Sequence, residues 1–265
     1  MIQDRNVFIG LAIKYKGDWR KIYQIVTSKE IEEVDENEFN ELIKGLDCGV
    51  ITILDKNYPD CLLHIFQPPF VLFYYGNINL INNISSNLGV IGTREPTAKA
   101  LNKTREIIKE LPKDIVIVSG LAAGIDGCAH EAALDYGHKT IAVLGCGVNV
   151  CYPSENQELM QRIRHTRGSL IISEYPPGTL PSQDKFPIRN RLITGLSSRI
   201  LITEAKRRSG TSITASYALD TGKEVLCLPS SDWGDSLCNN LLKDGGIPVE
   251  NAQEVNEYFE RRKLL

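Results

Sequence analysis

The sequence predicts an α/β fold, a doubly wound and mostly parallel sheet that follows a small helical module. From residue 88 onward, short apolar runs alternate with helical patterns along the 265-residue chain. The first two runs end in glycine-rich turns, Gly92-Thr93-Arg94 and Ser119-Gly120-Leu121-Ala122-Ala123-Gly124. Repeated strand, glycine turn and helix are the opening of a doubly wound sheet. Such sheets bind anions where the carboxyl ends of strands meet helix N-termini.

Composition limits the classes of function. The chain is 42% hydrophobic and 24% charged, with a net charge of -3, so any nucleic-acid site must be a local basic patch. The seven cysteines form no C-x-x-C pair and the four histidines show no ligand spacing, which indicates reduced thiols and no metal site. No cofactor is expected. With no signal peptide or membrane-length apolar run, we expect a cytoplasmic protein that does not associate with membranes.

We expect four segments: a helical module over 1–45, connecting strands and turns over 46–87, the main domain over 88–250, and a C-terminal helix over 251–265. In the first, Asp18 caps a helix that carries Trp19, and a further helical segment begins at Ser28 and includes Ile31 and Val34. Such a module binds DNA or protein, or serves only for packing. Strands are expected at 50–54 and 71–75.

The main domain alternates regularly. The predicted strands span 88–91, 115–118, 140–144, 170–172, 199–203 and 224–228. The predicted helices span 97–111, 125–136, 155–164, 189–196, 211–221 and 236–243, with a final helix over 251–262. This βα alternation implies right-handed crossovers and a mostly parallel sheet.

Glycine turns and basic runs should gather at the carboxyl edge of the sheet. Each glycine turn, including the one near Gly145, either approaches a bound ligand or is a tight turn without a ligand. Tyr152 either stacks on a ligand or is buried. The run 185–191 contains three bases and Phe186. Pro187 suits a helix start, so residues 189–191 are expected in the first turn. Cations there oppose the helix dipole at a cost of about 0.3–1 kcal/mol each, which a bound polyanion would offset.

A second basic run, 203–211, follows the next strand. The bases of these turns and runs exceed what one nucleotide needs; they are Arg94, Lys185, Arg189, Arg191, Lys206, Arg207 and Arg208. Bases interleaved with Phe186 and Tyr152 are typical of a groove for single-stranded nucleic acid.

No catalytic set emerges, so we expect a protein that is not an enzyme. Asp126 and His130 lie one helical turn apart and are expected to share a structural hydrogen bond, because no Ser or Cys nucleophile lies beside them. Glu204 is expected to brace a nearby base.

The ordered motifs resemble the DNA-processing protein A family (DprA, also called Smf) from about residue 50 to the end of the main domain. They are Gly92-Thr93-Arg94, Ser119-Gly120-x-Ala122-x-Gly124-Ile125-Asp126 with Ala129-His130, Ser173-Glu174-Tyr175, Phe186-Pro187-x-Arg189-Asn190-Arg191, and Ser209-Gly210-Thr211 with Ala215. The resemblance implies an extended Rossmann-like domain, a sterile-alpha-motif-like N-terminal module and a homodimer. It also implies binding of single-stranded DNA without chemistry, protection of incoming DNA during natural transformation, and loading of the RecA recombinase.

By position, the resemblance assigns DNA contacts to Arg94, Lys185, Phe186, Arg189 and Arg191. With the turns added, the expected DNA-binding set is Gly92, Thr93, Arg94, Ser119, Gly120, Gly124, Lys185, Phe186, Arg189, Asn190, Arg191, Lys206, Arg208, Ser209 and Gly210. The dimer interface is expected at the apolar residues of 236–246.

Two alternatives stay open. The chain also resembles the lysine decarboxylase-like phosphoribohydrolases, which have Pro-Gly-Gly-x-Gly-Thr-x-x-Glu at the turn over 206–214. Here bases replace the two glycines and Thr214 replaces the glutamate, which favours binding over hydrolysis. A sensor domain for a nucleotide-derived signal would share the fold.

Overall fold

A nine-stranded sheet organises the computed structural model, which describes residues 4–28, 36–231 and 234–261. The strand order is β1-β2-β6-β5-β4-β3-β7-β8-β9. The strands are β1 (Gly49–Thr52), β2 (Val71–Gly76), β3 (Asn87–Ile91), β4 (Val116–Ser119), β5 (Thr140–Leu144), β6 (Leu170–Ser173), β7 (Arg199–Ile202), β8 (Glu224–Cys227) and β9 (Ile247–Pro248). The α-helices are α1 (Arg5–Lys14), α2 (Trp19–Thr27), α3 (Glu36–Lys44), α4 (Asp60–Leu63), α5 (Ala98–Glu110), α6 (Ile125–Asp135), α7 (Gln157–His165), α8 (Lys185–Gly195), α9 (Gly210–Asp220), α10 (Leu237–Lys243) and α11 (Ala252–Arg261).

The strands from β3 to β9 are parallel and wind outward from the middle of the sheet. The chain starts at β3 and passes through β4, β5 and β6, then returns to the other side of β3 for β7, β8 and β9. The predicted Rossmann-like, mostly parallel α/β fold is therefore confirmed. The order reverses between β3 and β7, and sheets of this kind bind ligands at such a switch point, beyond the carboxyl ends of the strands.

Strands β1 and β2 extend this same sheet rather than connecting a separate module to it. β2 pairs antiparallel with β6, with Phe73 opposite Ser173, and β1 pairs antiparallel with β2. Val71, Leu72 and Phe73 are all buried, as expected for a strand with both faces covered. The sheet thus begins before residue 88, where we expected the main domain to start.

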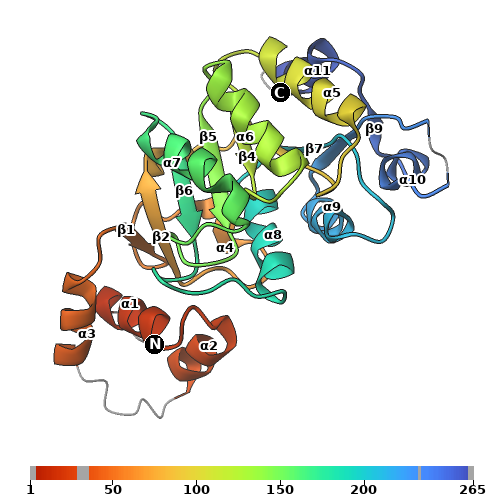
Figure 1. The fold of residues 1–265 in the computed structure, drawn as a ribbon. Helices are drawn as coiled ribbons and strands as arrows, with labels where there is room; N and C mark the ends of the chain where they lie inside the picture. Colours follow the sequence, from red (N-terminus) through yellow and green to blue (C-terminus); the bar gives the residue numbers. More distant parts are fainter. Residues whose placement is uncertain (1–3, 29–35, 232–233, 262–265) are drawn as a thin grey trace.

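Helices cover both faces of the sheet (Figure 1). One buried cluster joins α4, α8, α9 and α10 to the sheet, and a second joins α5, α6 and α11 to its other face. A third cluster joins α1 and α7 to β2, β5 and β6. No described helix is long and apolar enough to cross a membrane.

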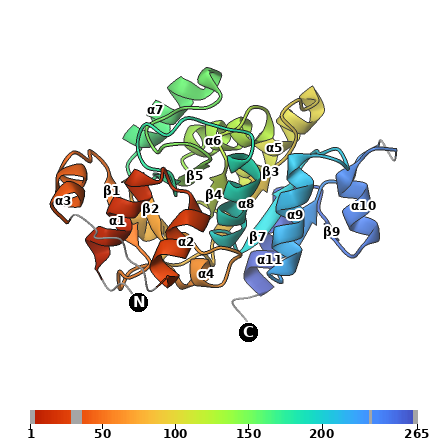
Figure 2. The same ribbon diagram turned by 90° about the horizontal axis from the view of Figure 1, so that it is seen from below.

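Within the described residues before β1, the helices α1, α2 and α3 lie at the opposite end of the molecule from α10 (Figure 2); we refer to them as the N-terminal module. The Asp18 carboxylate caps α2 by accepting from the backbone N–H of Arg20 and Lys21. Ile31 and Val34, expected in the third helix, lie outside the described residues. The resemblance of this module to sterile-alpha-motif modules stays a prediction.

The remaining elements follow the predicted order with shifted ends. α8 begins at Lys185, four residues before the expected start. A short 3-10 helix, Ser154–Asn156, precedes α7. The two-residue strand β9 was not predicted from the sequence pattern. The final helix, expected over 251–262, is α11; residue 262 lies outside the described part of the chain.

Candidate nucleic-acid interface

Two adjoining pockets open at the switch point. The larger, about 510 Å³, lies beyond the ends of β3 and β7. The smaller, about 160 Å³, lies beside it beyond the ends of β4 and β5. Arg94, Ala122, Tyr152, Phe186 and Arg189 line both. The geometry therefore forms one continuous site in which these residues separate two compartments.

Arg94, Phe186 and Tyr152 form a stack between the two pockets. The Arg94 guanidinium carbon lies 5.3 Å from the centroid of the Phe186 ring, within cation–π range. The Phe186 and Tyr152 rings stack with centroids 5.2 Å apart and an interplanar angle of 21°. Tyr152 keeps 43% of its surface exposed, so of its two expected roles the buried one is wrong. A nucleobase has access to this stack from solvent.

A glycine at position 145 makes room for the stack. A Cβ added there would lie 2.8 Å from a Phe186 ring carbon, which is closer than real Cβ contacts come. The glycine turn after β5 thus serves to seat Phe186.

Arg189 forms part of the site floor. Its Nη1 donates to the carbonyl oxygens of Gly120 (2.6 Å) and Val143 (2.5 Å). A Cβ on residue 120 would lie 2.3 Å from that Nη1, which explains the glycine. The Asp126 carboxylate accepts from the Gly120 N–H at 3.1 Å, and burial raises its pKa, while Arg189 acts in the opposite direction. Arg189 is thus a fixed buried cation with one face toward the pockets.

The expected place of the 189–191 bases in the first turn of a helix is wrong. Because α8 begins at Lys185, these residues fall in its second turn, where the dipole effect is weaker. Two carbonyl oxygens accept from Arg189 and the Asp126 carboxylate stabilises its charge, so the fold itself offsets this charge without a polyanion.

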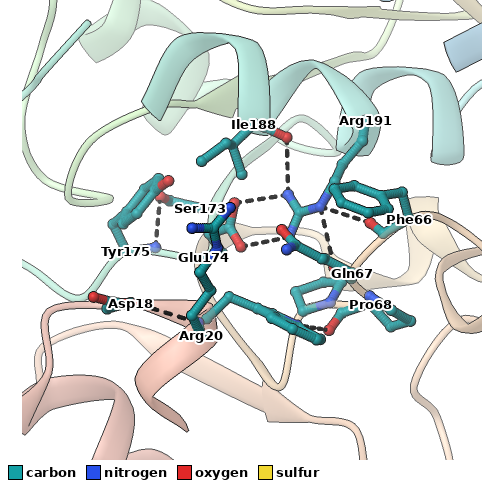
Figure 3. A network of polar contacts seen from close by, with 12 residues as sticks. Asp18, Arg20, Phe66, Gln67, Pro68, Ser173, Glu174, Tyr175, Ile188 and Arg191 are labelled. Atoms are coloured by element: carbon teal, nitrogen blue, oxygen red, sulfur yellow. Dashed lines mark hydrogen bonds and ion pairs between the residues drawn. The ribbon is translucent and has the colours of Figure 1, made fainter. Parts of the chain in front are cut away.

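Arg191, expected to contact DNA, does not reach the site. Its side chain is 1% exposed and forms a bidentate ion pair with Glu174 at 2.8 and 2.7 Å. Its Nε donates to the Phe66 carbonyl and its Nη2 to the Gln67 carbonyl (Figure 3). Every nitrogen of the guanidinium is therefore engaged inside the protein, and the residue has a structural role.

Most of the expected set does meet at the site. Gly92, Thr93, Arg94, Phe186, Arg189, Asn190, Lys206, Ser209 and Gly210 line the larger pocket, and Gly120 lines the smaller one. Ser119 and Gly124 lie behind the site and shape its turns: the Ser119 hydroxyl donates to the Val90 carbonyl, and Gly124 has φ +77°.

Besides Arg191, two further basic residues of the expected DNA-binding set lie outside both pocket linings. Lys185 donates to the Leu180 carbonyl at 2.7 Å, with its Nζ 5.3 Å from the Tyr175 ring centroid. Arg208 is exposed on the loop before α9.

The larger pocket also contains residues that the motifs did not predict. Gln183 and Glu95 line it, and nothing in their sequence context signals a site. Asp126 and Glu95 bring two acidic side chains into a site expected to be basic. Thr214 lines the pocket at the position where phosphoribohydrolases have glutamate.

The remaining expected pairings are wrong. His130 does not pair with Asp126: its Nδ1 lies 2.7 Å from the Thr140 hydroxyl, and burial lowers its pKa to about 3. Glu204 forms no ion pair with a basic side chain in the described part of the chain. Its carboxylate accepts from the backbone N–H and the hydroxyl of Thr97 at the start of α5. Nowhere in the described ranges do three His, Cys, Asp or Glu side chains gather in a metal-binding arrangement.

Comparisons with known proteins support the motif resemblance. The family model described as DNA recombination-mediator protein A matches residues 49–260. DNA processing protein DprA of Streptococcus pneumoniae is 40% identical over 211 residues, which cover 79% of this chain and 73% of that protein. DprA of Bacillus subtilis is 36% identical over 219 residues, 82% of this chain and 73% of that protein.

Two solved structures are similar over most of the chain. The X-ray structure of DprA from S. pneumoniae superimposes with a TM-score of 0.76 at 33% identity, covering 95% of this chain and 92% of that one. A structure of DNA processing protein A from Helicobacter pylori, whose subject is its single-stranded DNA binding mode, gives a TM-score of 0.72 at 30% identity, covering 82% and 98%. The chain therefore belongs to the DNA recombination-mediator protein A family, the DprA/Smf family of DNA processing proteins.

Proposed function

We propose that the chain binds single-stranded DNA at the carboxyl edge of its sheet. The observation that carries the proposal is the stack of Arg94, Phe186 and Tyr152 between two open pockets. An accessible aromatic surface beside a cation is what a groove for single strands requires, since every base offers a face for stacking. Family membership supports the same assignment, because a structure of the H. pylori relative concerns single-stranded DNA binding.

Phosphates and bases meet different parts of the site. Arg94 and Lys206 are exposed at its rim, and α9 begins there at Gly210, so phosphate groups lie along this rim. The floor contains the Asp126 carboxylate. A carboxylate repels phosphate and accepts hydrogen bonds from base N–H groups, so a base faces Asp126, whereas the neighbouring Arg189 cation attracts phosphate.

The proposal is binding without covalent chemistry. Thr214 lines the pocket where a hydrolase of the related fold has its glutamate, and a hydroxyl cannot replace a carboxylate as general base at neutral pH. Asp126 is engaged with the Gly120 N–H, and His130 faces Thr140. Neither side chain activates a nucleophile in this arrangement.

The first test is fluorescence anisotropy with labelled oligo-dT and a duplex of the same length across a salt series. We expect preference for the single strand, and a log–log salt slope near -0.7 per neutralised phosphate. Arg94→Glu should weaken binding about tenfold or more, because it removes a phosphate contact and adds a repulsion. Arg20→Glu is the matched control, an exposed arginine on α2 that lines neither pocket.

If a folded Arg94→Glu protein keeps the wild-type affinity, the stack is not the DNA site. If the wild type binds neither DNA at low salt, the single-stranded DNA assignment is wrong and nucleotide ligands become the next probes.

The proposal extends to recombination. Family membership supports a cytoplasmic mediator that protects entering single strands and loads RecA on them as a homodimer. RecA filament assembly on oligo-dT, with and without this protein, tests the loading step, and sedimentation tests the dimer. The expected interface at 236–246 is not retained, because Leu237, Cys238 and Leu241 pack into the chain's own core.

A further inference from the structure

A second basic surface lies at the opposite edge of the sheet from the aromatic stack. A hollow of about 650 Å³ forms where β2 ends and where β5 and β6 begin. Its cationic side chains come from separate segments: Lys139 from the residue before β5, Arg164 from the last turn of α7, and Arg167 from the turn that leads to β6. In Figure 1 the tip of β2 lies beside α7.

The cations of this hollow are not neutralised by neighbouring carboxylates. Its lining contains no Asp or Glu, and among the described residues none of Lys139, Arg164 and Arg167 takes part in an ion pair. By contrast, Arg162 on the same helix pairs with Asp135 at 2.6 Å. All three cations are exposed, so they present a positive field to solvent.

Stabilisation of α7 explains only part of this cluster. A cation in the last turn of a helix interacts favourably with the helix dipole, which accounts for Arg164. Arg167 follows the C-cap of the helix and gains less from the dipole, and Lys139 comes from another segment. Three cations therefore converge on the hollow, and none of them has an ion-pair partner among the described residues.

The chemistry of the hollow suits phosphates better than bases. Its lining contains no Phe, Tyr or Trp, and the nearby Tyr75 is buried, with one face covered by the Arg164 guanidinium, whose carbon lies 3.8 Å from the ring centroid. The imidazole of His165 is the one ring in the lining, against three cationic side chains. Contacts of cations with phosphates alone are independent of sequence and tolerate either single or double strands.

We propose that Lys139, Arg164 and Arg167 form a second DNA site, which holds the phosphodiester backbone of another segment of nucleic acid. This inference rests on the proposed function in that the ligand is taken to be DNA. Lys139 precedes β5 and Arg167 precedes β6, whereas the aromatic site follows β3 and β7. The two sites therefore lie at opposite ends of the parallel strands, and one protomer holds two separate segments.

The test is a titration of the full chain with a labelled four-nucleotide oligo-dT, kept short so that one oligonucleotide occupies one site. The wild type should bind in two phases, a tight one and a weaker, more salt-sensitive one, with two oligonucleotides per chain. Lys139→Ala with Arg167→Ala should remove the weaker phase and leave one oligonucleotide per chain. Lys14→Ala with Lys56→Ala removes the same charge from exposed positions outside both sites and should keep two.

Arg94→Glu separates this inference from the proposed function. Loss of the tight phase alone supports both sites. If the tight phase survives Arg94→Glu, the aromatic site is not the DNA site. The double variant of Lys139 and Arg167 then tests the second site by itself. If that variant titrates like the wild type, whether in one phase or two, the second DNA site is wrong. Both substituted side chains are exposed, and circular dichroism checks that the fold is retained.

Discussion

Phe186 has two neighbours in the proposed DNA site. Arg94 lies over its ring and Tyr152 stacks beside it. Phe186→Ala removes the centre of this stack, so affinity for oligo-dT should fall by about 1–3 kcal/mol, the usual range for loss of one base–aromatic contact. Phe186→Tyr keeps the ring and should stay near wild type. Anisotropy at fixed salt measures both, and an unchanged affinity for Phe186→Ala would contradict the stacking role.

Arg191 matters for stability rather than for binding. Arg191→Ala leaves Glu174, which is 5% exposed, buried without its partner. Removal of one member of a buried pair should lower the free energy of unfolding by about 3–5 kcal/mol. Arg162→Ala breaks an exposed pair with Asp135 and should cost less than about 1 kcal/mol. Urea denaturation compares the two, and equal losses would show that burial does not decide the difference.

The sequence placed Arg189 and Arg191 in one basic run but could not separate their roles. Residues two apart on a helix point about 200° from each other, so one faces the pockets and the other the 66–67 carbonyls. To tell the two residues apart, one must know where the helix begins and where a loop about 125 residues away in the chain lies. Phe186 and Arg94 were found because each lies in a motif next to a strand end.

The turn between β4 and α6 depends on Gly124. Its φ is +77°, and a Cβ there would lie 2.4 Å from the Thr93 carbonyl oxygen. Gly124→Ala should therefore cost both backbone strain, about 1–3 kcal/mol, and displacement of the turn that carries Arg94. Gly178→Ala is the control, with φ +78° and no atom within 4 Å of the added Cβ, so that it measures strain alone. We expect only Gly124→Ala to weaken oligo-dT binding, and equal binding by both would contradict this coupling.

Sequence reasoning predicted the strands β1 and β2 but not their place in the sheet. β2 pairs with β6, about a hundred residues later, and β1 pairs with β2. β9 is two residues long and is defined only by its pairing with β8. The start of α8 was placed too late because proline is tolerated throughout the first turn of a helix, and Pro187 is its third residue. The βα order from β3 to β8 was predictable because each element has its own apolar period.

At the scale of the whole molecule, buried His130 contributes to the pH dependence of stability. Burial lowers its pKa to about 3, whereas an unfolded histidine titrates near 6.5. Between these values the unfolded chain binds a proton that the folded chain does not, so stability should fall with falling pH by about 1.4 kcal/mol per unit from this residue. The stabilising contribution is complete above pH 6.5.

His130→Gln removes this titration. Its free energy of unfolding should therefore show a slope smaller by one proton between about pH 6.5 and pH 3 than that of the wild type. Urea titrations at several pH values measure the difference. Parallel pH profiles for the two proteins would mean that His130 takes up a proton in the folded state.

The short loop before β2 links the N-terminal module mechanically to the helix that carries Phe186. The carbonyls of Phe66 and Gln67 accept from Arg191 on α8, while the next carbonyl, of Pro68, accepts from the Trp19 indole at 2.7 Å (Figure 3). Two successive carbonyls are thus bound to α8 and the third to the N-terminal module, so a displacement of either part is transmitted to this loop. A displacement of α2 is therefore transmitted to α8 through three peptide units. A partner protein that binds and moves the N-terminal module would also shift Phe186 and its stack.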